Sequence, residues 1–122
     1  MNRLRIVLLE RSHDHTESLL LQIRMIGHDA HVCYSPEECV ETVKRVKPDA
    51  VLLNAGLPME RVYDLGRRLL DLPVSRPAVL RVSQPGDRID CDRSLKSGVR
   101  FHLTKPVSPP AIHDALTSCA EV

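Results

Sequence analysis

Apolar residues follow two alternating patterns along this chain. Short runs with a strand-like composition, clearest at 5–9 and 49–53, also occur at 31–34, 78–82 and 100–103. Continuous apolar runs of this length are typical of strands that are covered on both faces of a parallel sheet. We therefore predict five short strands.

Between these runs, apolar residues recur every three or four positions, which predicts amphipathic helices. The first helix carries its apolar residues at Leu19, Leu20, Ile23 and Ile26, and Gly27 is placed to end it. Four further helices follow, marked in turn by Val40, Val43 and Val46, by Val62, Leu65, Leu69 and Leu72, by the weaker stretch 89–97, and by Ile112, Ala115, Leu116 and Cys119.

Capping and breaking residues fix the ends of several elements. Ser35 is a typical N-cap, followed by Pro36 in the first turn and by Glu38 three residues after the cap. Pro48 stops that helix, and Gly98 ends the weak helix before the last strand. The predicted elements alternate strictly between strand and helix, which favours an α/β fold with right-handed crossovers and a parallel sheet.

Composition narrows the class of protein. The chain has 122 residues, a length that suits one domain, and a net charge of +1, which gives no basic field for nucleic acid or an anionic membrane. The start of the chain fits a first strand better than a secretion signal, and no run is long enough to span a bilayer. The four cysteines form no Cys-x-x-Cys pair, so we expect reduced thiols in a cytoplasmic protein.

Polar residues follow the predicted strands at their carboxyl ends, where open parallel sheets form their binding sites. Glu10 and Arg11 follow the first strand and Asn54 follows the third. Ser83 follows the fourth strand and Lys105 follows the fifth. We therefore expect the chemistry of this protein at that edge of the sheet.

With these residues in place, the chain resembles the receiver domains of two-component response regulators. Two segments carry the resemblance, PDAVLLNAGLP at 48–58 and GVRFHLTKP at 98–106. The first is similar to the family's third strand and the loop after its phosphoacceptor, and the second to its fifth strand and Lys-Pro pair. The resemblance covers residues 1–122 and implies one flavodoxin-like receiver domain, a doubly wound sheet of five parallel strands in the order 2-1-3-4-5.

The resemblance also implies a role for each polar residue at that edge. In the family, an aspartate after the third strand accepts a phosphoryl group from a histidine kinase, and two acids after the first strand help it hold Mg²⁺. Asn54 stands at the acceptor position, and Glu10 and Arg11 stand at the two acid positions. Ser83 and Lys105 match the residues that bind the phosphoryl oxygens.

Asn54 and Arg11 depart from the family pattern, and the departures decide the predicted function. An amide is no substitute for the attacking carboxylate oxygen, so Asn54 cannot form an acyl phosphate. Mg²⁺ prefers hard oxygen ligands, usually carboxylates, and Arg11 cancels the charge of Glu10. We expect no cofactor and weak or absent Mg²⁺ binding, with Glu10, Asn54 and the backbone of Gly56 as weak candidate ligands.

The sequence allows two interpretations for each of several residues near this edge. Arg11 either bridges Glu10 and Asn54 in place of the ion or lies on the surface. Gln84 either narrows the phosphoryl entrance or is a solvated loop residue. His102 occupies the family's switch position, where it is a titrating group or a packed imidazole. Arg81 falls inside an apolar strand, where we expect a paired or snorkelling side chain.

These residues predict a non-enzymatic protein-interaction module in two-component or phosphorelay signalling. Expected partners are a histidine kinase, a phosphotransfer domain or an output domain, with no nucleic acid and no membrane. The resemblance implies that the fourth helix, the fifth strand and the fifth helix meet partners, including a second copy in a homodimer, around Arg93, Lys96, Arg100 and His113.

Two alternatives keep different chemistry. In the first, a receiver is phosphorylated at another residue, Asp14 or Ser12. In the second, a flavodoxin-like protein binds a small anion through Lys105, Ser83 and Arg11.

Overall fold

The structure is a computed structural model of the whole chain. It describes residues 3–10, 13–53, 59–73, 77–83, 96, 98–104 and 109–120. In the order of the sequence, the elements are β1 (Arg5–Leu9), α1 (His13–Met25), β2 (Asp29–Cys33), α2 (Pro36–Val46), β3 (Ala50–Leu53), α3 (Met59–Leu70), β4 (Ala78–Ser83), β5 (Val99–Thr104) and α5 (Pro109–Ala120).

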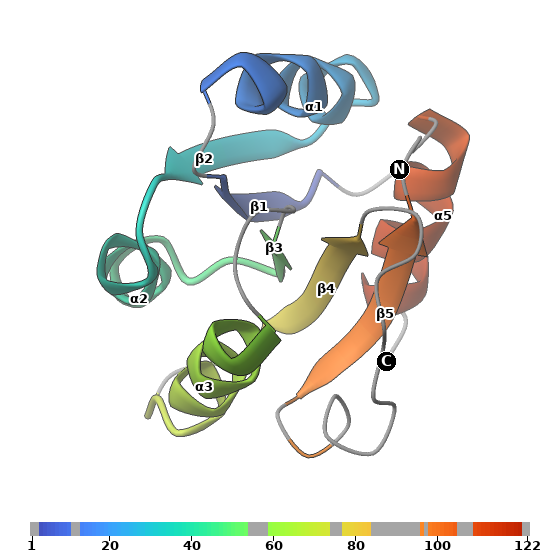
Figure 1. Cartoon of the computed structure of the whole chain (residues 1–122). Helices are drawn as coiled ribbons and strands as arrows, with labels where there is room; N and C mark the ends of the chain where they lie inside the picture. The colour runs from blue at the N-terminus through green and yellow to red at the C-terminus, as the bar shows by residue number, and fades with distance from the viewer. Residues whose placement is uncertain are drawn as a thin grey trace.

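The five strands of the described chain form one parallel sheet in the order β2-β1-β3-β4-β5. This confirms the predicted doubly wound α/β fold and its strand order. Figure 1 shows the sheet in the middle of the molecule, with helices on both sides. The chain crosses over after β2, which places β1 beside β3 and creates the switch in strand order where open α/β sheets bind their ligands.

The sheet separates two hydrophobic cores because successive side chains of a strand point to opposite faces. On one face, Leu8 and Leu52 pack with Ile23 of α1 and Ile112 of α5. On the other face, the core is formed by alternate residues of the same strands together with α2 and α3, namely Val7, Leu9, Val51, Leu53, Cys39, Val43, Val62, Leu65 and Leu69. Every position of β3 is buried, as the continuous apolar run predicts.

Helix α2 shows how local sequence sets an element. The Ser35 side chain accepts a hydrogen bond from the Glu38 N–H at 3.1 Å, and the Glu38 carboxylate accepts one from the Tyr34 N–H at 3.1 Å. The helix ends at Val46, and Lys47 adopts a left-handed conformation with φ of 53°, from which its N–H donates to the Val43 carbonyl. The predicted N-cap and the stop before Pro48 are both confirmed.

Strand β2 begins two residues earlier than the sequence pattern predicts. The structure pairs Asp29 with Arg5 of β1, and β2 ends at Cys33, with Tyr34 in the turn before α2. The polar start of the strand carries no apolar signal because β2 lies at the edge of the sheet and is only half-buried there. The predicted fourth helix, 89–97, lies outside the described residues except for Lys96, which is helical.

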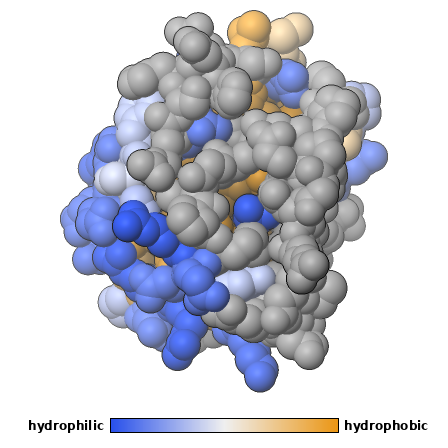
Figure 2. Space-filling model, in the orientation of Figure 1, coloured by the Kyte–Doolittle hydropathy of each residue, from blue (hydrophilic) through white to orange (hydrophobic). Residues whose placement is uncertain are grey.

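The two sides of the surface differ in polarity. Figure 2 shows hydrophilic side chains gathered at the lower left, over α2 and α3, and a hydrophobic cluster at the top, over α1. Leu21 and Met25 of α1 are exposed by 59% and 76%, while Tyr34 is exposed by 40%. In the described part of the chain, no helix has the length and hydrophobicity required to cross a membrane.

Candidate functional site at the carboxyl edge of the sheet

The strand register brings the carboxyl ends of the five strands to one edge of the sheet. Leu9, the last residue of β1, lies between Cys33 of β2 and Leu53 of β3. Leu53 in turn lies beside Arg81 of β4. Farther along, Ser83 pairs with Thr104 of β5. The residues that follow β1 and β3 in the sequence therefore leave the sheet at neighbouring positions of one edge.

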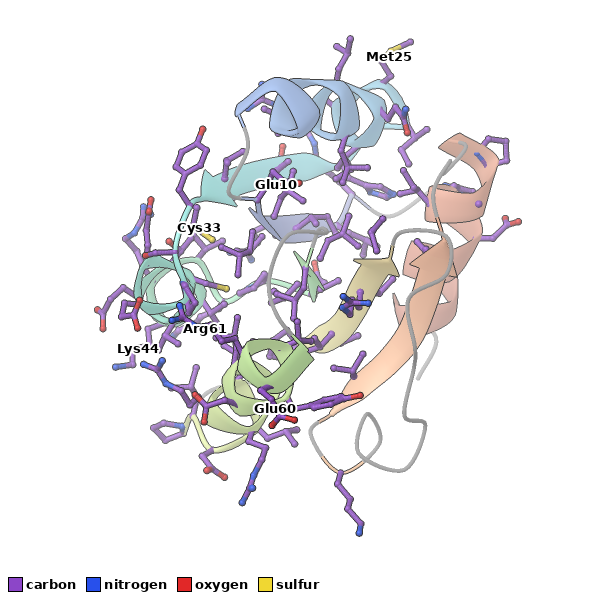
Figure 3. All side chains as sticks on the ribbon, viewed as in Figure 1. Glu10, Met25, Cys33, Lys44, Glu60 and Arg61 are labelled. Carbon is purple, nitrogen blue, oxygen red and sulfur yellow. The ribbon has the colours of Figure 1, made fainter. Side chains whose placement is uncertain are left out.

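Glu10 is the predicted site residue whose side chain the structure describes. It is 2% exposed, and its N–H donates to the Cys33 carbonyl at 3.1 Å, which continues the pairing of β1 with β2 by one residue. Figure 3 shows Glu10 in the interior beside the strands, in contrast to Met25, which projects from α1 at the surface. A buried carboxyl group is costly without polar contacts. The burial of Glu10 therefore indicates that its surroundings at this edge of the sheet are polar.

The side chains of the other predicted site residues fall outside what the structure describes. Asn54, Arg11, Gly56, Gln84 and Lys105 are not among the described residues. For Ser83 and His102 the structure describes the backbone alone. Ser83 ends β4, and His102 of β5 pairs with Arg81 of β4. The roles predicted for these seven residues remain predictions.

Arg81 is a second buried charged residue near the same edge. It is 4% exposed and lies in β4 between Leu53 of β3 and His102 of β5. Its neighbours Leu80 and Val82 point to the core of α1 and α5, so Arg81 points to the opposite face, that of α2 and α3. The sequence signal for this residue is a lone charge in an apolar strand, and sequence reasoning gave it no functional role.

The thiols at the end of β2 and in α2 are suited to packing rather than to catalysis. Cys33 and Cys39 are both free and fully buried. The Cys33 thiol donates to the Leu8 carbonyl at 3.6 Å, and a hydrogen bond with the Cys39 side chain, together with burial, raises the pKa of Cys33. Because the thiolate is the reactive form, Cys33 is a poor nucleophile.

Among the residues that the structure describes at this edge, Glu10 supplies a single candidate ligand for Mg²⁺. Mg²⁺ needs several hard oxygen ligands in near-octahedral geometry. Among the described residues, no three His, Cys, Asp or Glu side chains gather closely enough to hold a metal ion. Glu10 supplies one buried carboxylate, and the sequence follows it with the cation Arg11. We therefore derive no step that uses a bound metal ion.

Comparison with known proteins bears on the fold. No protein-family model matches the chain. The response regulator receiver domain of Methylobacillus flagellatus superimposes with a TM-score of 0.85 and 19% identity, over 97% of this chain and 99% of that one. A response regulator receiver domain protein of Clostridium thermocellum gives a TM-score of 0.84 and 17% identity, over 96% and 94%.

A third similar structure is the signal receiver domain of a histidine kinase from Syntrophus aciditrophicus. It gives a TM-score of 0.79 and 22% identity, over 96% of this chain and 89% of that one. The similarity thus extends over nearly the whole chain in each case, and at these identities it establishes the fold. The chain has the flavodoxin-like fold of response regulator receiver domains.

Proposed function

We propose that this chain is a degenerate receiver domain, which acts as a protein-interaction module in two-component or phosphorelay signalling without phosphorylation at Asn54. The fold supports this proposal, since similar structures include receiver domains of response regulators and of a histidine kinase. Two observations carry it together: Glu10 is buried directly after β1, and the sequence has Asn54 directly after β3, where a receiver needs its aspartate.

The acceptor position decides the chemistry. Phosphoryl transfer to a receiver requires an anionic carboxylate oxygen that attacks phosphorus. The side chain of Asn54 is a neutral amide, whose oxygen is no comparable nucleophile. We therefore expect no acyl phosphate at this position, and no catalytic turnover by this chain.

The charge at the carboxyl edge supports the same proposal. Arg11 stands where a receiver has its second acid, and Arg81 adds a buried cation near the edge. Two unit charges about 4 Å apart interact by about 4 kcal/mol at an effective dielectric constant near 20. Exchange of an attractive carboxylate for a repulsive guanidinium at such a distance is enough to remove useful Mg²⁺ affinity.

Without phosphorylation, the proposed domain transmits its signal by binding another protein. Proposed partners are a histidine kinase, a phosphotransfer domain or an output domain in the cytoplasm. The face of β5 and α5, with the fourth helix that the resemblance implies, is the proposed contact surface, including the surface of a homodimer. Four residues were predicted on this surface: Arg93, Lys96, Arg100 and His113. The structure describes the side chains of Lys96, which is exposed, and of His113, which is half-buried on α5.

A Mg²⁺ titration followed by NMR tests the proposal. The wild type is compared with Arg11→Asp, with Asn54→Asp and with the double variant. We expect saturable shifts of the amide resonances around residues 10 and 54 in the double variant, and none in the wild type. Saturable Mg²⁺ binding by the wild type at this edge would contradict the proposal.

Mass spectrometry after incubation with a small phosphodonor and Mg²⁺ gives an independent test. We expect no phosphoryl adduct on the wild type. The double variant serves as the positive control, because it restores the carboxylate nucleophile. An adduct on Ser12 or Asp14 of the wild type would instead favour a receiver phosphorylated at another residue.

A further inference from the structure

A cavity of about 500 Å³ opens at the amino edge of the sheet, the edge opposite Glu10. It is formed where α1 ends and where β1 and β2 begin. Volumes of about 300–1,000 Å³ are typical of small-molecule sites. The cavity is lined by Arg3, Arg24, His28, Asp29, Ala30 and His31.

The side chains around this cavity include two cations and one anion. Arg3 and Arg24 contribute two guanidinium groups, and Asp29 is the one carboxylate in the lining. Asp29 is engaged by Arg3, whose Nε lies 3.2 Å from its Oδ1. Arg24 is exposed and forms no ion pair within the described part of the chain. One guanidinium therefore faces this cavity without a counter-charge among the described residues.

His28 adds a buried polar group to the lining. It is 3% exposed, and its Nδ1 accepts a hydrogen bond from the Leu4 N–H at 3.1 Å. The neutral ring must then carry its proton on Nε2. Within the described residues, Nε2 has no hydrogen-bond partner. A buried donor without an acceptor is costly, and an oxygen-rich ligand would remove that cost.

The electrostatic environment keeps this ring neutral. Burial is the main cause that lowers the pKa of His28, and His113, whose ring stacks on it at 6.2 Å between centroids, lowers it further. Asp29 and Asp49 act in the opposite direction. His28 is thus a neutral donor beside two arginines and not a third cation, which suits a ligand with several acceptor oxygens.

We propose that this cavity binds a small phosphorylated molecule, with its phosphate group held by Arg24 and Arg3. Guanidinium groups present planar forks of donors that match phosphate oxygens. The single carboxylate in the lining is already paired with Arg3, so it opposes a bound anion only in part. This site is independent of the proposed function, because it lies at the other edge of the sheet and needs no Mg²⁺.

An NMR titration with two probes tests the proposal at constant ionic strength and without Mg²⁺. The probes are inorganic phosphate and glucose 6-phosphate. We expect saturable shifts of the backbone amides of 28–31 and of the Arg24 Nε–H. Saturation by both probes means that a bare phosphate is sufficient, whereas saturation by glucose 6-phosphate alone means that the ligand is a phosphomonoester; both support the proposal.

Three variants distinguish specific binding in this cavity from a general attraction of the anionic probe to positive charge. Arg24→Ala should weaken binding about tenfold, because a charge-assisted contact is lost. The matched control Arg67→Ala removes an exposed arginine from the last turn of α3 and should leave binding unchanged. Asp29→Asn removes the one acid of the lining and should tighten binding.

Two results would overturn the proposal. One is the absence of saturable shifts at 28–31 with either probe. The other is an equal loss of affinity in Arg24→Ala and Arg67→Ala, since binding would then follow the total charge rather than this cavity. Stability of each variant is checked by urea unfolding, so that a folding defect is not taken for a loss of binding.

Discussion

The two edges of the sheet differ in how far their charged side chains are exposed to water. At the amino edge, charged side chains are exposed and bind the backbone or one another: the Arg5 N–H donates to Asp49 at 2.8 Å, and the Arg5 guanidinium donates to the Val46 carbonyl at 3.0 Å. At the carboxyl edge, Glu10 and Arg81 are almost fully buried. The same kinds of group are thus solvated at one edge and enclosed at the other.

This difference teaches where a change in charge matters. An exposed ion pair gains little because water screens the charges and because two flexible side chains must be ordered. A buried charge has lost its hydration, so removal of what compensates it is far more costly. The comparison predicts that substitutions at the carboxyl edge alter stability more than substitutions of the same kind at the amino edge.

The largest expected effect is at Arg81. We expect Arg81→Ala to lower the free energy of unfolding by about 3 kcal/mol, since it empties a buried volume and leaves former polar contacts uncompensated. Urea unfolding followed by circular dichroism measures the change. Arg81→Met, which keeps most of the volume, separates packing from charge.

The control for Arg81 is Arg67→Ala, an exposed arginine of α3, for which we expect a change within about 0.5 kcal/mol. If Arg81→Ala and Arg67→Ala cost the same, the contrast between a buried and a solvated arginine is wrong.

An intermediate effect is expected at His28, the buried imidazole of the amino edge. His28→Phe leaves the Leu4 N–H without its acceptor, which should cost about 1–2 kcal/mol near pH 7. His28→Gln keeps an acceptor, and a smaller loss is expected for it. Urea unfolding at several pH values measures both variants beside the wild type.

The same residue makes stability depend on pH. Because the pKa of His28 is lowered in the folded state, the unfolded state binds more protons as pH falls below the ordinary value of 6.5. Stability should therefore be full above pH 6.5 and decline as the pH falls through the lowered pKa. The groups that face the ring are His113 of α5, Asp29 and Asp49, with Arg3 and Arg24 around the same cavity. A wild-type decline that persists unchanged in His28→Gln would exclude His28 as its source.

The smallest effect is expected for the exposed pair of Arg3 and Asp29. Their side chains are 71% and 47% exposed. We expect Arg3→Ala to change the free energy of unfolding by less than about 0.5 kcal/mol, and less still in high salt. A loss as large as that of Arg81→Ala would show that the two edges do not differ as described.

Much of the fold could be predicted from the sequence because local signals agreed with one another. The stripe of Val40, Val43 and Val46, the Ser35 cap and the stop before Pro48 each pointed to the same helix, α2. The start of β2 was misplaced, because an edge strand can begin with Asp29 and Ala30 and needs no apolar run. Pairing with β1, and not the local pattern, sets that boundary.

The candidate site was predicted less completely than the fold. Glu10 was assigned from its place after a strand, and the structure adds that it is buried. Arg81 stood out in the sequence only as a charged residue in an apolar strand, since the sequence does not show which face of the sheet its side chain occupies. The cavity beside Arg24 and His28 had no sequence signal at all, because it joins the end of α1 to the starts of two strands.

By itself, the sequence determined the alternation of strands and helices, the α2 cap and the amide side chain of Asn54 after the third strand. Periodicity and residue type are properties that a local stretch of sequence carries. Only the tertiary structure decided that Glu10 and Arg81 are enclosed and that Arg3, Arg24 and His28 meet around one cavity. Burial and long-range contact depend on how the two layers of helices close over the sheet, and no local pattern carries that information.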